Sequence, residues 1–355
     1  MDAPYSRNGA LTLVAMPGFE SISQRVKQKV ESMYEANPDR RPTPVDIVFP
    51  IFGQRASGEP YLRLGKDHIG GHDCVVITSG PGTYEMLMQL YIVLKYLVGR
   101  RAHRIAVVCG YFPLSRSDKD EGALEFAMTR PTTDLLMEGS CGLLDRIIVA
   151  DLHAQQVVAA GRIGLVTEVS LVRRLLTRTI EDAHKETSKI CLALPDDGAA
   201  KRVEGAMADA QDKLKIQLAT VFGAKRRKSS RSSDIKQLFG DLMALRESIV
   251  ICLDDEIATG GTNIDTAISL KKDYNAAKVW AAVTHGVLCG EAPQRFSLPN
   301  CPVDRIYAMD TIPFESRTHL SPLIANNKLI VLSWWEDLSW IIYCHHWDES
   351  IRELR

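Results

Sequence analysis

One stretch of the chain, residues 249–262, combines two carboxylates with a glycine-rich loop. It reads Ile-Val-Ile-Cys-Leu-Asp-Asp-Glu-Ile-Ala-Thr-Gly-Gly-Thr. Its five apolar residues, 249–253, predict a short buried strand, and residues 263–273 are typical of a helix. Glycines let the intervening loop close around an anion, which backbone N–H groups and the helix dipole stabilise. The pattern therefore predicts a phosphate site. Its residues would be Thr259, Gly260, Gly261 and Thr262.

The carboxylates of Asp254 and Asp255 need a different partner, because like charges repel and neither can bind the phosphate. They suit hydroxyl groups beside the phosphate, or a divalent metal. A sugar phosphate such as a ribose phosphate offers both a phosphate and vicinal hydroxyls. A P-loop is disfavoured because no lysine follows the glycines. An ordinary glycine-rich turn is the simpler alternative.

Polar side chains follow several of the predicted strands, and open parallel sheets bind ligands at the carboxyl ends of their strands. Alone, each cluster has a simple explanation: a salt-bridged loop, a buried histidine with satisfied nitrogens, or a solvated acidic pair. Together they predict a site for a nucleoside triphosphate with Mg²⁺, in which carboxylates and neutral histidine hold the metal and arginine neutralises phosphate. The clusters are Arg116/Asp118, Asp151/His153, Asp196/Asp197 and Asp254/Asp255.

A basic, serine-rich run, Lys-Arg-Arg-Lys-Ser-Ser-Arg-Ser-Ser, occupies residues 225–233. A solvated loop is one interpretation. The other is a mobile lid whose cations stabilise charge on transferring phosphoryl groups. A nucleic-acid interface is disfavoured because the whole chain carries a net charge of only −1.

The totals are those of a soluble globular protein with no membrane or nucleic-acid surface. The 355 residues suffice for two domains, 45% are hydrophobic and 25% are charged. No apolar run approaches the ~18 residues of a membrane span, and the first ten residues lack a signal-peptide pattern. Eight cysteines are scattered without a Cys-x-x-Cys pair. They predict free thiols in a reducing compartment, the cytoplasm.

Apolar strands alternate with helical segments along the whole chain, which predicts parallel α/β units. The order favours two such domains, residues 1–168 and 169–333. The C-terminal stretch, 334–355, has helical spacing and four tryptophans, and we expect it to pack back on the first domain.

Further motifs extend the pattern beyond the glycine-rich loop. They are Tyr-Phe-Pro-x-x-Arg-x-Asp-Lys at 111–119, Asp-Leu-His-Ala at 151–154, Pro-Asp-Asp-Gly-Ala-Ala-Lys-Arg at 195–202, Thr-His-Gly at 284–286 and Asp-Thr-Ile-Pro at 310–313. In order and spacing the chain resembles the PRPP synthetase (ribose-phosphate diphosphokinase) family over residues 45–350. Asp120-Glu121-Gly122 and the Asp-Asp-Gly at 196–198 are most similar to its plant-type, phosphate-independent branch.

The resemblance implies a fold of two type I phosphoribosyltransferase-like domains, each with a mainly parallel sheet flanked by helices. It implies transfer of diphosphate from ATP to the 1-hydroxyl of ribose 5-phosphate, giving PRPP and AMP with Mg²⁺ as cofactor. It also implies a homo-oligomer built from dimers, a hexamer among the sizes it allows.

The resemblance assigns roles residue by residue. Ribose 5-phosphate would be bound by Asp254, Asp255, Thr259, Gly260, Gly261 and Thr262. ATP would be bound by Glu59, Arg116, Asp118 and His153, in part across a subunit boundary. Mg²⁺ would be held by His153 and Asp196, and the transferring diphosphate would be stabilised by Lys225 and Arg227.

Some positions depart from the family pattern. Ala258 stands where an acidic residue is usual. The family's adenine-stacking phenylalanine is replaced, and Arg55 is the residue nearest to its position in the sequence. After Gln156 the chain reads Val-Val-Ala-Ala-Gly instead of Ile-Gln-Gly-Phe-Phe. These departures leave an alternative, a catalytically weak family member that regulates an active partner. Lys225, Arg227 and His153 favour the enzyme, because a regulatory subunit needs none of them.

Overall fold

The computed structural model describes residues 6–66, 68–119, 126–226, 235–351 and 354. It divides into two compact units. Unit 1 comprises Met1–Ser170, Thr311–Ser316 and Ser333–Arg355, and unit 2 comprises Leu171–Asp310 and Arg317–Leu332. The chain therefore crosses from one unit to the other more than once.

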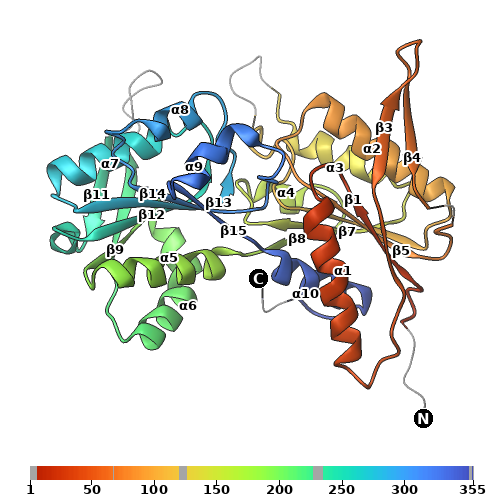
Figure 1. The fold of residues 1–355 in the computed structure, drawn as a ribbon, viewed down its shortest axis with the longest axis horizontal. Coiled ribbons are helices and arrows are strands. Elements are labelled where there is room, and N and C mark those ends of the chain that lie inside the picture. The colour runs from red at the N-terminus through yellow and green to blue at the C-terminus, as the bar shows by residue number, and fades with distance from the viewer. Residues whose placement is uncertain (1–5, 67, 120–125, 227–234, 352–353, 355) are drawn as a thin grey trace. The chain divides into compact units, whose positions relative to one another are not determined.

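Unit 1 is built on a fully parallel six-stranded sheet with the strand order β2-β1-β5-β6-β7-β8 (Figure 1). The strands are β1 (Leu11–Ala15), β2 (Val45–Val48), β5 (Asp73–Thr78), β6 (Arg104–Cys109), β7 (Leu144–Ala150) and β8 (Val166–Val169). The helices are α1 (Glu20–Glu35), α2 (Tyr84–Gly99), α3 (Thr129–Gly139), α4 (Gln156–Ala159) and α10 (Trp335–His346). A separate antiparallel hairpin joins β3 (Pro50–Gln54) to β4 (Pro60–Leu64).

Helices cover both faces of this sheet, which explains why its strands read as continuous apolar runs. Alternate strand residues such as Val76 and Val107 form one core with Leu94 and Leu97 of α2 and Leu136 of α3. Figure 1 shows α1 and α10 together on the opposite face. The apolar strands thus bury both sets of side chains, and only their ends remain for polar chemistry.

The C-terminal helix α10 contacts α1 and the start of the sheet through aromatic and ionic groups. The rings of Tyr34 and Tyr343 lie 5.3 Å apart, and the guanidinium of Arg40 lies 4.4 Å from the ring centre of Trp347. Trp334, immediately before the helix, is fully buried. Residues from the two ends of the sequence therefore form one core.

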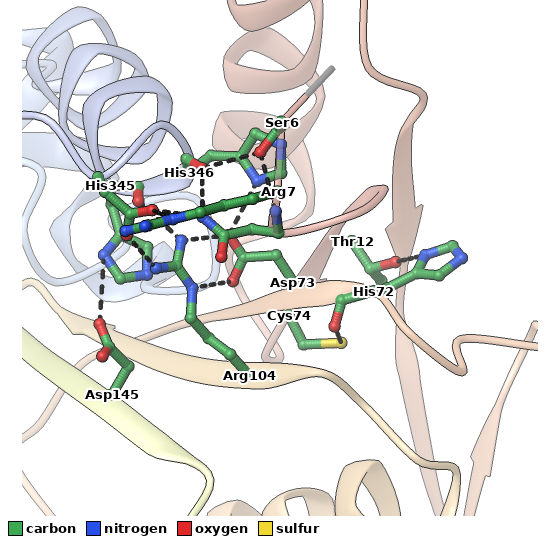
Figure 2. Close-up of polar contacts among 12 residues, drawn as sticks. Ser6, Arg7, Thr12, His72, Asp73, Cys74, Arg104, Asp145, His345 and His346 are labelled. Atoms are coloured by element: carbon green, nitrogen blue, oxygen red, sulfur yellow. Dashed lines mark hydrogen bonds and ion pairs between the residues drawn. The ribbon is translucent and has the colours of Figure 1, made fainter. Parts of the chain in front are cut away.

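A buried ion cluster lies beneath α10 (Figure 2). The fully buried carboxylate of Asp73 accepts hydrogen bonds from Arg104 Nε at 3.0 Å and Nη2 at 2.7 Å, and His346 Nδ1 lies 2.9 Å away. Arg104 Nη1 also donates to Asp348 at 2.7 Å. Burial alone would raise the pKa of Asp73, but the hydrogen bonds from His346 and Arg104 lower it.

Unit 2 is built on a seven-stranded sheet with the order β11-β10-β9-β12-β13-β14-β15, parallel except for the β10–β11 pair. The strands are β9 (Ile190–Leu194), β10 (Ala219–Arg226), β11 (Ile235–Gly240), β12 (Ile249–Ile257), β13 (Lys278–Gly286), β14 (Arg305–Met309) and β15 (Leu329–Leu332). The helices are α5 (Val172–Glu186), α6 (Asp197–Leu214), α7 (Gly261–Asp273), α8 (Ala292–Ser297) and α9 (Ser321–Ala325), with 3₁₀ turns η1 (Leu242–Leu245) and η2 (Thr318–Leu320).

The predicted α/β class is confirmed: both sheets are mainly parallel and flanked by helices. Several predicted boundaries are wrong. The strand at 249–253 continues to Ile257, and the C-terminal helix covers Trp335–His346 only. No helix within the described residues has the length and apolar character to cross a bilayer.

Candidate functional site

The glycine-rich loop joins β12 to α7 in unit 2, as its sequence predicts. β12 lies in the middle of the sheet between β9 and β13, so its carboxyl end opens at the centre of the carboxyl edge. α7 begins at Gly261, two residues earlier than expected. The loop between strand and helix therefore contains only Ala258, Thr259 and Gly260. A loop this short presents the helix N-terminus directly at the strand end.

Gly260 is the residue that makes this turn possible. Its φ of 76° lies in the left-handed region, and a Cβ built there would meet the ring of Phe296 at 2.5 Å. Both the backbone conformation and the packing therefore require glycine. Thr259 and Thr262 are exposed, and no side chain of the described residues caps α7 at Gly260. The first-turn N–H groups of a helix lack intrahelical partners, so this end suits an anion.

Asp254 and Asp255 lie within β12 rather than after it, because the strand continues for four residues past Leu253. Both are half-buried, and Asp254 Oδ1 accepts a hydrogen bond from the Asp255 N–H at 3.1 Å. Successive side chains of a strand point to opposite faces of the sheet. The two carboxylates therefore approach the strand end from different sides.

Glu256 is a residue that sequence reasoning missed. The motif treats it as a spacer, yet only 8% of it is exposed, and it pairs in register with the buried His285 of β13. It shares a strand face with Asp254. Glu256 stands two residues after Asp254, and residues two apart on a strand share a face. This spacing is the sequence signal that could have identified it.

Two polar turns follow neighbouring parallel strands of unit 1, β6 and β7. Arg116 is exposed and Asp118 half-buried after β6, while His153 is exposed after β7. Because β6 and β7 are adjacent and parallel, both turns lie at the same edge of the sheet. The structure therefore brings the predicted ATP residues of these two turns to one edge.

Both turns are fixed by short contacts. After β6, a Cβ on Gly110 would meet the Thr311 carbonyl oxygen at 2.0 Å, so the chain there requires glycine. After β7, Asp151 adopts a φ of 30° and accepts a hydrogen bond from Ser170 Oγ at 2.8 Å. Glu168, also missed by sequence reasoning, accepts from the Leu152 N–H at 2.7 Å and thereby holds the turn that carries His153.

Glu59 lies in the exposed turn of the β3–β4 hairpin, apart from the six-stranded sheet (Figure 1). Its side chain accepts a hydrogen bond from Ser57 Oγ at 2.8 Å. In the same hairpin, the guanidinium of Arg55 lies 5.8 Å from the ring centre of Tyr61. The hairpin thus presents both residues to solvent in a defined turn.

Asp196 has a structural role at the start of α6. It is the N-cap, and its Oδ1 accepts a hydrogen bond from the Ala199 N–H at 2.9 Å. Asp196 is exposed and belongs to unit 2, whereas His153 belongs to unit 1. The two predicted metal ligands therefore belong to different units.

The basic run begins in a strand and not in a loop, which corrects the prediction. β10 extends to Arg226, and Lys225 pairs in register with Lys236 of the antiparallel β11. The prediction failed because the partner strand lies beyond the basic run, where sequence periodicity gave no signal. Arg227 lies outside the described residues.

Within the described part of the chain, no group of three or more metal-ligating side chains is arranged to hold an ion. Mg²⁺ does not need such a group, because it usually keeps several waters and is bound through one or two carboxylates plus substrate phosphates. The scattered, exposed donors His153 and Asp196 fit that chemistry and do not fit a closed protein cage.

Two cavities of unit 2 lie away from the predicted residues. One, of about 550 Å³, is lined by Lys189, Gln217 and Arg246 among others, near the amino ends of β9 and β10. The other, of about 340 Å³, lies beside Phe296 and Asp304. Neither includes a residue of the predicted site.

Comparison with known proteins identifies similar chains. A family model described as the N-terminal domain of ribose phosphate pyrophosphokinase matches residues 45–138. The ribose-phosphate pyrophosphokinase of Hyphomonas neptunium is 30% identical over 259 residues, which cover 72% of this chain and 77% of that protein. Ribose-phosphate pyrophosphokinase 2 of Saccharomyces cerevisiae is 28% identical over 284 residues, covering 77% and 82%.

The fold is also similar to a solved structure. The crystal structure of phosphoribosylpyrophosphate synthetase from Mycobacterium smegmatis superposes with a TM-score of 0.70 at 25% identity. The alignment covers 95% of this chain and 98% of that one. The similarity therefore extends over both units.

Proposed function

The chain belongs to the ribose-phosphate pyrophosphokinase family, and from that premise we propose that it transfers diphosphate from ATP to the 1-hydroxyl of ribose 5-phosphate. The products are PRPP and AMP. Like its relatives, the chain is an enzyme. The observation that carries the proposal is the turn at Gly260, which places the uncapped start of α7 beside two carboxylates.

The sugar phosphate occupies the end of β12. Backbone N–H groups of the loop and of the first turn of α7 bind the 5-phosphate, with the exposed hydroxyls of Thr259 and Thr262 beside them. Asp254 and Asp255 accept hydrogen bonds from the ribose hydroxyls. These contacts orient the 1-hydroxyl for attack on the β-phosphorus of ATP.

Residues of unit 1 contact ATP. Arg116 neutralises phosphate charge, and Asp118, Glu59 and His153 complete the nucleotide contacts. Lys225 and Arg227 stabilise the charge that develops on the transferring diphosphate. Glu59 stands on a projecting hairpin, which suits a site completed across a subunit boundary in a dimer-based homo-oligomer.

Mg²⁺ supplies charge neutralisation for the triphosphate when it is bound. The resemblance assigns its ligation, or that of its waters, to His153 and Asp196, which would supply a ring nitrogen and a carboxylate oxygen. Asp196 Oδ1 already caps α6, which leaves its second carboxylate oxygen as the metal donor. All eight cysteines are free thiols, which supports the proposed cytoplasmic location.

The decisive experiment measures products. The full-length protein with ATP, ribose 5-phosphate and Mg²⁺ should form AMP and PRPP in equal amounts, and EDTA should stop both. Formation of ADP in place of AMP would identify an ordinary phosphoryl kinase and reject the proposal. A protein that forms neither product alone but raises the rate of an active relative would be the regulatory subunit.

The resemblance to the plant-type branch gives a further expectation. The altered segment after Gln156 forms the short helix α4 and the turn after it. We propose that activity does not require added inorganic phosphate. Rates in phosphate-free buffer should match those in phosphate, and a strict phosphate requirement would place the chain in the other branch.

A further inference from the structure

We propose that Arg317, which lies outside every motif considered above, positions the ribose-phosphate loop by holding the segment that braces it. This inference rests on the proposed function, because it concerns the same loop. The bracing segment is residues 286–290, which starts at the last residue of β13 and leads toward α8. Arg317 immediately precedes η2 and is far from this segment in sequence, although both belong to unit 2.

The bracing segment is bonded to the strand end and the loop. The Leu288 N–H donates to the Ile257 carbonyl at 2.8 Å, and the Cys289 N–H donates to the Ala258 carbonyl at 3.0 Å. Ile257 ends β12, and Ala258 begins the turn that leads to Gly260. These two bonds continue the β12–β13 pairing beyond the sheet and fix the direction in which the turn leaves it.

Arg317 holds the other side of one of these peptide groups, the one between Val287 and Leu288. Its Nη1 donates to the Gly286 carbonyl at 2.8 Å, and its Nη2 donates to the Val287 carbonyl. A trans peptide group is planar, and its C=O and N–H point in opposite directions. Fixing the Val287 carbonyl therefore fixes the Leu288 N–H, which points at Ile257. Arg317 thus acts on the loop through one rigid peptide plane.

The guanidinium is suited to this position. Its two terminal nitrogens match two successive carbonyls, a fork that a lysine ammonium cannot reproduce. Burial lowers the pKa of Arg317 to about 10, so the group is still charged at neutral pH and makes charge-assisted bonds. Leu288, between the two sets of bonds, is fully buried with a φ of 45°, a conformation that needs such support.

The same stretch of chain supports the loop from a second side. Phe296 of α8 packs against the Cα of Gly260 so closely that no side chain fits there. The bracing segment joins β13 to α8, so its position also determines where this ring lies. Loosening the segment should therefore disturb the loop N–H groups that face the phosphate, while leaving the ATP residues of unit 1 unaffected.

The test uses the full-length protein with Arg317→Met, which keeps the aliphatic stem and removes the fork. We expect the KM for ribose 5-phosphate to rise about ten-fold, since small misplacements of binding groups are costly. The KM for ATP should change less than about two-fold. The factor by which kcat falls should be smaller than the factor by which the ribose 5-phosphate KM rises. Arg173→Met, an exposed arginine paired with Asp209 in the same unit, is the matched control.

Two additional measurements separate positioning from a general loss of structure. Guanidinium ion at low, non-denaturing concentration should lower the raised KM of Arg317→Met, whereas equal concentrations of sodium chloride should not. Arg317→Lys, which keeps the charge and one donor direction, should lie between the wild type and Arg317→Met. Amide exchange of Leu288 should accelerate in Arg317→Met without any substrate present.

The outcomes are distinct. The positioning role would be overturned by an unchanged ribose 5-phosphate KM in Arg317→Met. It would also be overturned by equal increases in the KM for both substrates that guanidinium does not reverse. If Arg317→Met does not fold, Arg317→Lys and the Leu288 exchange rate decide the question. A wild-type protein that makes no PRPP would instead reject the proposed function, and the exchange measurement would still test the brace.

Discussion

Asp254 and Asp255 are neighbours in sequence, but a strand directs them to opposite faces. Replacing each of them singly by alanine should therefore affect substrate binding differently. Asp255→Ala should weaken ribose 5-phosphate binding about ten-fold, because a hydrogen bond to a charged group contributes roughly 1.5–3 kcal/mol. ATP affinity should be unchanged. Calorimetric titration of both substrates measures this, with Asp254→Ala as the matched variant. Unchanged ribose 5-phosphate affinity in Asp255→Ala would contradict the assignment.

Lys225 tests the proposed role of the basic run at the scale of one side chain. If its ammonium acts on charge that develops in the transition state, Lys225→Ala should lower kcat by about 10²–10³ and raise KM little. Thermal stability should barely change. Steady-state kinetics and a thermal melt measure both effects, with the exposed Lys215→Ala as control. Near-normal kcat in Lys225→Ala would show that the catalytic cation lies elsewhere.

The strand, turn and helix around the glycine-rich loop were predicted well because their order is encoded locally. Glycine at 260 is dictated by backbone conformation and by its neighbours, and a strand, a turn and a helix follow one another within 25 residues. The roles of Glu168 and Arg317 could not be predicted in this way. Each acts through backbone groups that only the folded chain brings near.

At the scale of elements, the same distinction separates the correct predictions from the wrong ones. The strongly apolar run 84–98 predicts a helix, and the structure has one at Tyr84–Gly99, because the apolar residues and the Thr83 cap are encoded locally. β11 was not predicted from the sequence. It is an edge strand that is held by pairing with β10, and the basic run separates the two strands in the sequence. β12 was predicted too short, since its last residues are polar and are held in the sheet by β13.

Helix α10 carries a histidine, His345, whose pKa is lowered by the fold. Burial lowers the pKa of His345 from 6.5 to about 4, with Asp73, Arg104, Asp145 and Arg146 as its charged surroundings. The unfolded chain binds a proton at this histidine in the window between those values and the folded chain does not. The contribution of His345 to the free energy of unfolding is therefore fully present above pH 6.5. It falls as the pH drops toward 4, by up to about 3 kcal/mol.

Melting temperatures measured from pH 7 to pH 5 should show this loss. His345→Asn removes the titrating ring, so its melting temperature should depend less on pH across that range than the wild type's. His319→Asn, at an exposed position of unit 2, should leave the wild-type dependence intact. Equal pH dependence in wild type and His345→Asn would exclude His345 as the source.

At the scale of the whole molecule, the order of the chain and the order of the units differ. The chain completes the sheet of unit 1 by residue 170, forms most of unit 2, and returns to unit 1 with Ser333–Arg355. Trp334, Leu338, Ile341 and Ile342 of the returning segment are fully buried. Unit 1 therefore lacks part of its core until the last residues are made.

A chain that ends at Leu332 should consequently fail to fold unit 1. Fully burying a large apolar side chain contributes about 1.5–3 kcal/mol, so four of them contribute about 6–12 kcal/mol, comparable to the total stability of a domain. His346 and Asp348 would also be lost, leaving the buried Asp73–Arg104 pair with fewer partners. We expect the shortened chain to be insoluble or to be rapidly proteolysed within residues 6–170.

A chain that ends at Ile351 keeps all these contacts and should melt close to the wild type. Cooperative melting of the 332-residue chain at the wild-type temperature would show that unit 1 folds without its C-terminal segment.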